Sequence, residues 1–347
     1  MTSPHALPTA VERDFLDALV RMGLLQPAHP APAVVPLTGG VSSDIVRVDL
    51  DAGPVCVKRA LPRLKVKADW QAPVERNRWE VEWMRTAARV EPDAVPRILG
   101  EDAAAGMFAM AFLDESSHPV WKALLRDGHI NPAFAGEVGR RIAHIHAATA
   151  GDAQVGERFA TDHIFFPIRL EPYLVATGRA HPDLAPRLEQ LAAQTGATHL
   201  ALVHGDVSPK NILRGPHGPV FLDAECAWYG DPAFDLAFCL NHMLLKGLWR
   251  PHWSSQYLAC FDALAGAYLG GVTWEARSAI DARTAALLPG LFLARVDGKS
   301  PVEYITDDWQ RQAVRRVARP LLAQPPASLR EVMAAWKDEI AGWKQRT

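Results

Sequence analysis

The chain has 347 residues, ample for one large domain or two lobes, and 49% of them are hydrophobic against 22% charged. A formal net charge of −2 without a clustered basic face argues against nucleic acid or an anionic membrane as a partner. The four cysteines have no paired spacing, so neither a zinc site nor a disulfide framework is indicated. We find neither a basic leader segment nor an apolar run of roughly 18 residues, and we expect a cytoplasmic protein.

The first part of the chain is predicted to be rich in strands. Thr9 and Glu12 form a capping-box pattern before a helix that ends near Gly23, and a proline-rich connector follows. From Leu37 the alternation of residues predicts a hairpin with its turn at 51–54. An amphipathic helix over 74–90 and two further strands, near 96–99 and 107–113, complete this part.

Helical patterns dominate beyond residue 113. The clearest helix has Asn131 at its cap and Pro132 at its first position. We therefore expect an α+β protein with a β-rich N-terminal lobe over residues 1–113, a hinge near 111–114 and a helical C-terminal lobe over residues 114–347.

A short loop between two apolar runs, "HGDVSPKNIL" at 204–213, carries an unusual amount of polar chemistry. Asp206 and Asn211 in this loop, with Asp223 after the next strand, supply two carboxylates and an amide oxygen. Such oxygens are the ligands that Mg²⁺ prefers, and one carboxylate remains as a base. Phosphoryl transfer needs this division between a metal that neutralises phosphates and a base for the attacking hydroxyl.

Residues upstream of the loop suit the phosphates of a nucleotide. Glycines in "TGGVSS" at 38–43 let backbone amides approach phosphates closely, and Lys58 in a strand can pair with them. A lysine in that position needs an acidic partner. Glu80 on the amphipathic helix is the first candidate, and Glu82 is the alternate.

Together these residues resemble the aminoglycoside phosphotransferase and choline kinase family, which includes methylthioribose kinase. The similarity runs from about residue 37 to at least 245 and includes "HGDVSPKNIL", "FLDAE" and "YGDPAFDLA". It implies a bilobal protein-kinase-like fold in which Asp206 is the catalytic base and Asn211 and Asp223 bind metal. By the same resemblance, Glu225 contacts a second metal or the acceptor, and Asp235 braces the catalytic loop through its backbone.

Further residues are assigned to the nucleotide, the loop or the acceptor. His204 is expected to support the loop structurally, whereas Lys210 is a departure from the family pattern without an assigned role. The nucleotide-binding candidates are Gly39, Gly40, Ser42, Ser43, Lys58, Glu80, Met110, Ala111 and Leu113. The acceptor-binding candidates are Trp228, Trp249, Trp253, Arg295 and Asp297, with the segment around Arg169 and Tyr173 as the alternative.

The function implied by the resemblance is ATP-dependent transfer of the γ-phosphate to a hydroxyl of a small molecule, with Mg²⁺. The acceptor class stays open among amino sugars, amino alcohols, methylthioribose and related metabolites. A nucleotide-binding regulator without catalysis is an alternative, against which the joint presence of Asp206, Asn211 and Asp223 counts. A protein kinase is disfavoured because no long activation segment follows Glu225.

Overall fold

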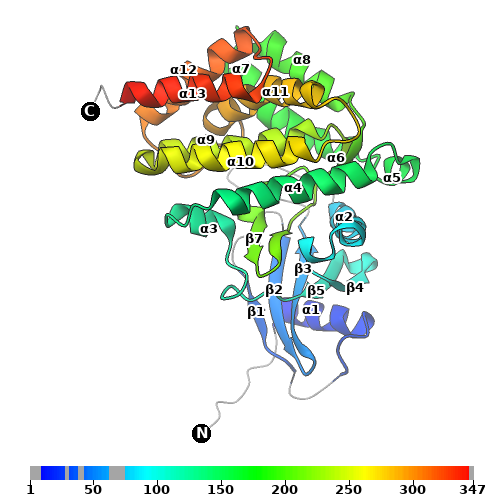
Figure 1. The fold of residues 1–347 in the computed structure, drawn as a ribbon. Coiled ribbons are helices and arrows are strands. Elements are labelled where there is room, and N and C mark those ends of the chain that lie inside the picture. Colours follow the sequence, from blue (N-terminus) through cyan, green and yellow to red (C-terminus); the bar gives the residue numbers. More distant parts are fainter. Residues whose placement is uncertain (1–8, 28–30, 38–42, 62–74, 344–347) are drawn as a thin grey trace.

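The computed structural model describes residues 9–27, 31–37, 43–61 and 75–343. Its first part contains a five-stranded antiparallel sheet with the strand order β1-β2-β3-β5-β4. The strands are β1 (Val34–Pro36), β2 (Ser43–Leu50), β3 (Gly53–Ala60), β4 (Ile98–Asp102) and β5 (Met107–Ala111). Figure 1 shows this sheet at one end of the molecule and a stack of helices at the other.

A helix covers each face of the sheet. Helix α1 (Ala10–Arg21) packs Phe15 and Leu19 against Val55 and Val57 of β3. Cys56 points to the opposite face and belongs to the main core, together with residues of α2 (Arg76–Val90). Because successive strand residues face opposite sides, Lys58 points to the same side as Cys56, toward α2 and the helical part of the protein.

The rest of the chain is mainly helical. Helix α4 runs along the boundary between the sheet-bearing part and the other helices (Figure 1). The longer helices are α4 (Pro132–Thr149), α8 (Ala185–Gly196), α9 (Ala233–Trp249), α10 (Ser254–Gly270), α11 (Arg277–Asp297), α12 (Asp308–Ala323) and α13 (Leu329–Trp343). The short helices are α3 (Trp121–Arg126), α5 (Ala153–Arg158), α6 (Asp162–Phe165) and α7 (Ala176–Ala180), with the π-helical segment η3 (Phe166–Val175) joining α6 to α7.

Two small antiparallel hairpin-like sheets lie within the helical part. Strand β6 (Ala201–Val203) pairs with β9 (Trp228–Gly230), and β7 (Ile212–Gly215) pairs with β8 (Gly218–Phe221). The loop between β6 and β7 and the segment between β8 and β9 are therefore held side by side. The first connection contains Asp206 and Asn211, and the second contains Asp223.

The predicted α+β architecture and most element positions are confirmed. The capping box of Thr9 and Glu12 is present at α1, and the 51–54 turn joins β2 to β3. The prediction of a connector throughout the proline-rich stretch was wrong, because its last residues form β1. Pro36 is compatible with that strand because β1 lies at the edge of the sheet, where a missing N–H removes no ladder bond. Among the described residues, no helix combines the length and apolar character needed to cross a membrane.

The N-terminus of α4 offers a test of the fold. The Asn131 side chain accepts hydrogen bonds from the backbone N–H groups of Ala133 and Phe134. Asn131→Ala should lower the free energy of unfolding by about 1 kcal/mol, whereas Asn131→Asp, which keeps the acceptor, should stay close to the parent. Urea unfolding of the three proteins measures this, and equal losses in both variants would contradict the assigned cap.

Candidate active site

Lys58 of β3 contacts two carboxylates. Glu80 lies on α2, which packs on the sheet, and Asp223 belongs to the helical part. Its Nζ donates to Oε2 of Glu80 on α2 at 2.6 Å and to Oδ1 of Asp223. Glu82, the alternate partner, instead forms ion pairs with arginines of its surroundings. Burial alone would lower the pKa of Lys58, but Asp223 and Glu80 outweigh this effect and raise the pKa, so the lysine stays charged.

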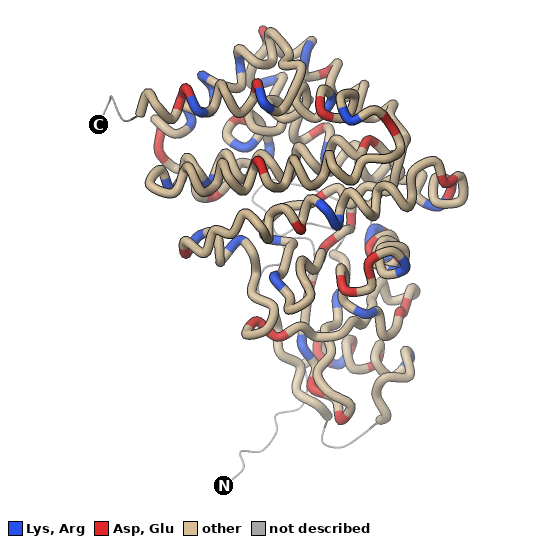
Figure 2. Tube along the Cα trace, in the orientation of Figure 1, with Lys and Arg blue, Asp and Glu red and all other residues tan. Residues whose placement is uncertain are grey.

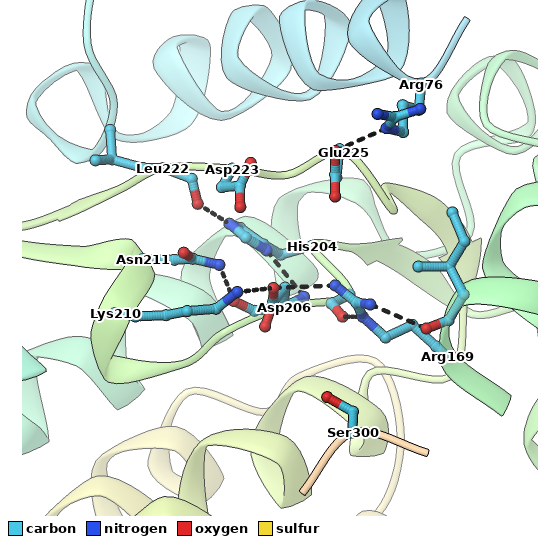
Figure 3. Close-up of polar contacts among 12 residues, drawn as sticks. Arg76, Arg169, His204, Asp206, Lys210, Asn211, Leu222, Asp223, Glu225 and Ser300 are labelled. Atoms are coloured by element: carbon cyan, nitrogen blue, oxygen red, sulfur yellow. Dashed lines mark hydrogen bonds and ion pairs between the residues drawn. The ribbon is translucent and has the colours of Figure 1, made fainter. Parts of the chain in front are cut away.

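Asp223 follows β8 in a backbone conformation that is uncommon for residues other than glycine. Among the described residues it alone, apart from glycines, has a positive φ, of 67°. Such a conformation costs on the order of 1–3 kcal/mol and persists only where the surroundings impose it. Here the contact with Lys58 and the pairing of β7 with β8 fix the segment. Figure 3 shows Asp223 on the side of Asn211 and His204.

The loop after β6 is braced by Asp235 at the start of α9. The backbone N–H of His204 donates to Oδ2 of Asp235 at 2.7 Å, and that of Gly205 donates to Oδ1 at 2.8 Å. Gly205 has φ +80°, and a Cβ there would meet the carbonyl oxygen of Cys226 at 2.7 Å. The loop therefore needs both this glycine and this carboxylate to keep its shape.

His204 holds the two functional segments together. The backbone N–H of Asp206 donates to its Nδ1 at 3.1 Å, so the proton lies on Nε2, which faces the carbonyl oxygen of Leu222 at 3.2 Å. Trp83 of α2 packs edge-on against the ring, with centroids 4.7 Å apart. Burial lowers the pKa of His204 and keeps it neutral, as its two hydrogen bonds require.

Asp206 lies between two cations (Figure 3). Its Oδ2 is 3.0 Å from Nη2 of Arg169 and 3.1 Å from Nζ of Lys210. Burial would raise the pKa of Asp206, but Lys210 and then Arg169 outweigh burial and hold the pKa well below its usual range. Asp206 is therefore ionised at neutral pH, and its carboxylate is paired with both Arg169 and Lys210.

Arg169 was assigned only to the alternative acceptor segment, and its contact with Asp206 was missed. It lies on η3, whose helix is wider than an α-helix, and it also donates to the carbonyl oxygens of Gly205 and Ile168. Segments of π-helix frequently occur at functional sites. Pro172 within a helical stretch was the sequence signal for an irregular helix here.

The metal-ligand candidates can be compared with what Mg²⁺ requires. Asn211 donates its Nδ2 to the backbone oxygen of Asp206 at 3.1 Å, which leaves its amide oxygen as a ligand. Asp223 has a second carboxylate oxygen beside the one bound to Lys58. Glu225 is bound through Oε2 to Nε of Arg76 at 2.9 Å. Since Mg²⁺ takes one or two carboxylates and completes its shell with phosphates and waters, Asn211 and Asp223 fit it. The described residues contain no cluster of three histidines, cysteines or carboxylates able to enclose a metal.

The nucleotide-binding candidates are only partly covered. Gly39, Gly40 and Ser42 lie outside the described residues. Ser43 begins β2 and is buried, while Met110 and Ala111 end β5 beside β3. Leu113 follows β5, where the chain leaves the sheet. The assignment of these residues to a nucleotide stays a prediction.

The acceptor candidates are not gathered in one place, and two of them have structural partners. Trp228 is fully buried, stacks on Phe165 at 4.2 Å and donates its Nε1 to Asp162. Asp297 is engaged by Arg315 and His181 at the end of α11. Both side chains have structural partners that sequence patterns did not reveal.

The other three acceptor candidates differ in their surroundings. Trp249 is half-buried against Tyr304, with ring centroids 4.9 Å apart. Trp253 contacts His252 and covers Gly128, where a Cβ would clash with its ring. Arg295 donates to the Tyr173 hydroxyl at 2.9 Å and to Ser300. Arg295 therefore joins α11 to η3, the segment that carries Arg169.

Comparison with known proteins gives a consistent result. The model of a phosphotransferase enzyme family matches residues 33–280. A methylthioribose kinase of Erwinia tasmaniensis is 30% identical over 221 residues, covering 55% of this chain and 54% of that protein. One from Yersinia pseudotuberculosis is 27% identical over 222 residues, covering 55% and 53% respectively. The chain thus spans about half the length of the curated relatives that it matches.

A solved structure shows that the fold is the kinase-like one. The amicoumacin kinase in complex with AMP-PNP, Ca²⁺ and its antibiotic has a TM-score of 0.51 at 13% identity, covering 88% of this chain and 91% of that one. The expected bilobal type of fold is therefore confirmed.

The brace formed by Asp235 can be tested by substitution. Asp235→Ala should lower the free energy of unfolding by about 3 kcal/mol, because two buried N–H groups lose their acceptor and each costs roughly 1–3 kcal/mol. Urea unfolding measures this, with Asp262→Ala on the exposed face of α10 as the control for loss of a carboxylate. Equal stability of the two variants would show that the loop does not depend on this brace.

Proposed function

The chain belongs to the phosphotransferase enzyme family, and from this membership and the site geometry we propose that it transfers the γ-phosphate of ATP to a hydroxyl of a small molecule. The observation that carries the proposal is the contact of Lys58 with Asp223, two residues 165 positions apart. It brings a phosphate-binding cation to the segment that follows the catalytic loop. A methylthioribose kinase as relative and a neighbour containing AMP-PNP support ATP as donor.

We assign the nucleotide to the N-terminal lobe, residues 1–113, and the acceptor to residues 114–347. Lys58, oriented by Glu80, would pair with phosphate oxygens of the nucleotide. Asn211 and Asp223 would hold Mg²⁺, which neutralises charge on the phosphates when bound. Arg76 keeps Glu225 beside these residues, so Glu225 serves mainly to order the segment.

Asp206 would orient the acceptor hydroxyl and receive its proton as the phosphoryl group is transferred. A weakly basic carboxylate suffices, because the transition state of phosphoryl transfer is loose and demands positioning more than strong proton abstraction. Arg169 and Lys210 keep Asp206 ionised and fix its carboxylate. An acceptor must therefore fit among the charged side chains of Asp206, Arg169 and Lys210.

The alternatives are less well supported by the same geometry. A regulator that only binds nucleotide would need no carboxylate braced as Asp206 is. A protein kinase would need room for a regulated segment after Glu225, but β9 begins at Trp228 and α9 at Ala233. A coupled ADP-release screen over hydroxylated metabolites and antibiotics separates enzyme from regulator.

Substitution of Asp206 tests the assigned base. Asp206→Asn should lower kcat by about 100-fold or more, the scale of a lost general base, while the affinity for an ATP analogue stays near that of the parent. Calorimetry and the coupled assay measure the two quantities, and Asp262→Ala controls for a lost surface carboxylate. If Asp206→Asn kept the turnover of the parent, Asp206 would not be the base.

Substitution of Lys58 tests the place of the nucleotide. Lys58→Met should raise the KM for ATP at least about tenfold, since a hydrogen bond to a charged group contributes roughly 1.5–3 kcal/mol, and should leave the acceptor KM unchanged. Lys337→Met, at an exposed position of α13, is the matched control. If only the acceptor KM changes, the nucleotide has been placed wrongly.

A further inference from the structure

A second group of polar side chains lies in the helical part, and we call it the basic cluster: His242, Lys246 and Arg295. Each has a buried nitrogen without a hydrogen-bond partner in the part of the chain that the structure describes, namely Nε2 of His242, Nζ of Lys246 and Nε of Arg295. Unpaired buried nitrogens also occur elsewhere in the described residues, for example at Arg59 and Arg250, but Lys246 is the only ammonium group among them, and it lies one helical turn from His242 on α9.

Lys246 of α9 is the most unusual member. It is 1% exposed, and its Nζ lies 4.6 Å from the ring centroid of Tyr304 and 5.5 Å from that of Trp249. Lys246 forms no ion pair with a described carboxylate; Glu303 raises its pKa electrostatically but is itself paired with Lys122 at 2.5 Å. Burial, aided by Lys122, lowers the pKa of Lys246 to about 7.

The aromatic contacts do not offset the cost of burying the charge of Lys246. Cation–π attraction is worth about 2 kcal/mol when desolvated, which is less than the several kcal/mol that an unpaired buried charge costs. Rings also accept no strong hydrogen bond from the ammonium group. The site is favourable for the charged lysine only when an anion joins it.

Arg295 of α11 extends the cluster toward η3. Its Nη1 donates to the Tyr173 hydroxyl and to the backbone and side-chain oxygens of Ser300, all neutral groups. Within the described residues it forms no ion pair. Arginine at such a position presents further N–H groups in a planar fork that matches carboxylate and phosphate.

The basic cluster lies within electrostatic range of Asp206. Nδ1 of His242 lies 3.4 Å from the Tyr304 hydroxyl, and both Asp206 and Lys210 affect the pKa of His242 electrostatically. On the other side, Tyr173 and Arg169 share η3. Figure 3 shows the hydroxyl of Ser300, a partner of Arg295, directed toward Asp206 and Arg169.

Two cations of this region form no ion pair with a described carboxylate. Arg169 and Lys210 both pair with Asp206, whereas Lys246 and Arg295 form no such pair, and Glu303 acts on Lys246 only electrostatically. Figure 2 shows basic and acidic residues interspersed over both parts of the molecule. An amino sugar or amino alcohol would bring a further ammonium group into this field and be repelled.

We propose that the acceptor is an anionic hydroxy compound, whose carboxylate or phosphate group is bound by Lys246 and Arg295 while its hydroxyl faces Asp206. The inference rests on the proposed phosphotransferase function and narrows its acceptor class. His242 supplies a further nitrogen at the anionic end, and Trp249 and Tyr304 supply apolar walls. Amino sugars and choline-like amino alcohols, which the sequence left open, are thereby disfavoured.

A binding experiment tests the anion site apart from turnover. The full chain is saturated with a non-hydrolysable ATP analogue and Mg²⁺, so that the nucleotide site is filled, and is then titrated with inorganic phosphate or acetate at constant ionic strength. Thermal unfolding should show stabilisation of the parent by at least one anion. Lys246→Met should weaken the apparent affinity for that anion at least tenfold, whereas Lys337→Met should not change it.

Further variants guard against a general folding defect. Arg295→Gln should weaken the same anion, and Lys246→Arg, which keeps the charge, should retain part of the affinity. Each variant must still be stabilised by the ATP analogue alone, which shows that it is folded. Absence of stabilisation of the parent by both anions, or an equal response of the parent and Lys246→Met, would overturn the proposal.

A transfer assay distinguishes carboxylate from phosphate and keeps the two proposals separate. Glucuronate, glucose 6-phosphate, glucose and glucosamine differ chiefly in one group and are compared in the coupled ADP-release assay. Preference for glucuronate or for the phosphate ester supports the proposal and identifies the anionic group. Preference for glucosamine overturns it while leaving the phosphotransferase function intact.

Discussion

The contact of Lys58 with Glu80 and Asp223 is the interaction on which the site depends. Lys58 and Glu80 are taken out of water there and Asp223 is partly so, and the charge of each is stabilised by its partners. Loss of one partner of a buried ion pair typically costs about 3–5 kcal/mol, since an uncompensated charge remains. β3, α2 and the segment after β8 are therefore held in one relative position by electrostatics rather than by apolar packing alone.

A consequence is that the cations proposed to face the phosphates and the acceptor are both held by carboxylates of the protein itself. Lys58 is paired with Asp223, and Lys210 with Asp206. Phosphates entering between these pairs would offer oxygens to both lysines, while a metal ion would take over the charge of Asp223. The pairing stabilises these side chains and places cations where the proposed reaction would move negative charge.

Sequence patterns predicted the fold and the positions of the two polar segments because both depend on local rules. The alternation of apolar and polar residues predicted the β2–β3 hairpin, and the Asn131 cap predicted the start of α4. The spacing from Asp206 to Asn211 predicted the loop. Strand-like runs precede both Asp206 and Asp223, and this pattern indicated that the segments carrying the two carboxylates would lie close together. The brace from Asp235 followed from the family resemblance and is present in the structure.

The acceptor side could not be predicted in the same way, because its residues belong to helices that the sequence presents as core. Lys246 lies within an apolar run of α9, and nothing local distinguishes it from a lysine that reaches solvent. Only the packing of Tyr304 and Trp249 around it reveals that its charge is enclosed. Catalytic loops are constrained by a shared reaction, whereas acceptor recognition is assembled from distant helices, so family membership constrains the first far more than the second.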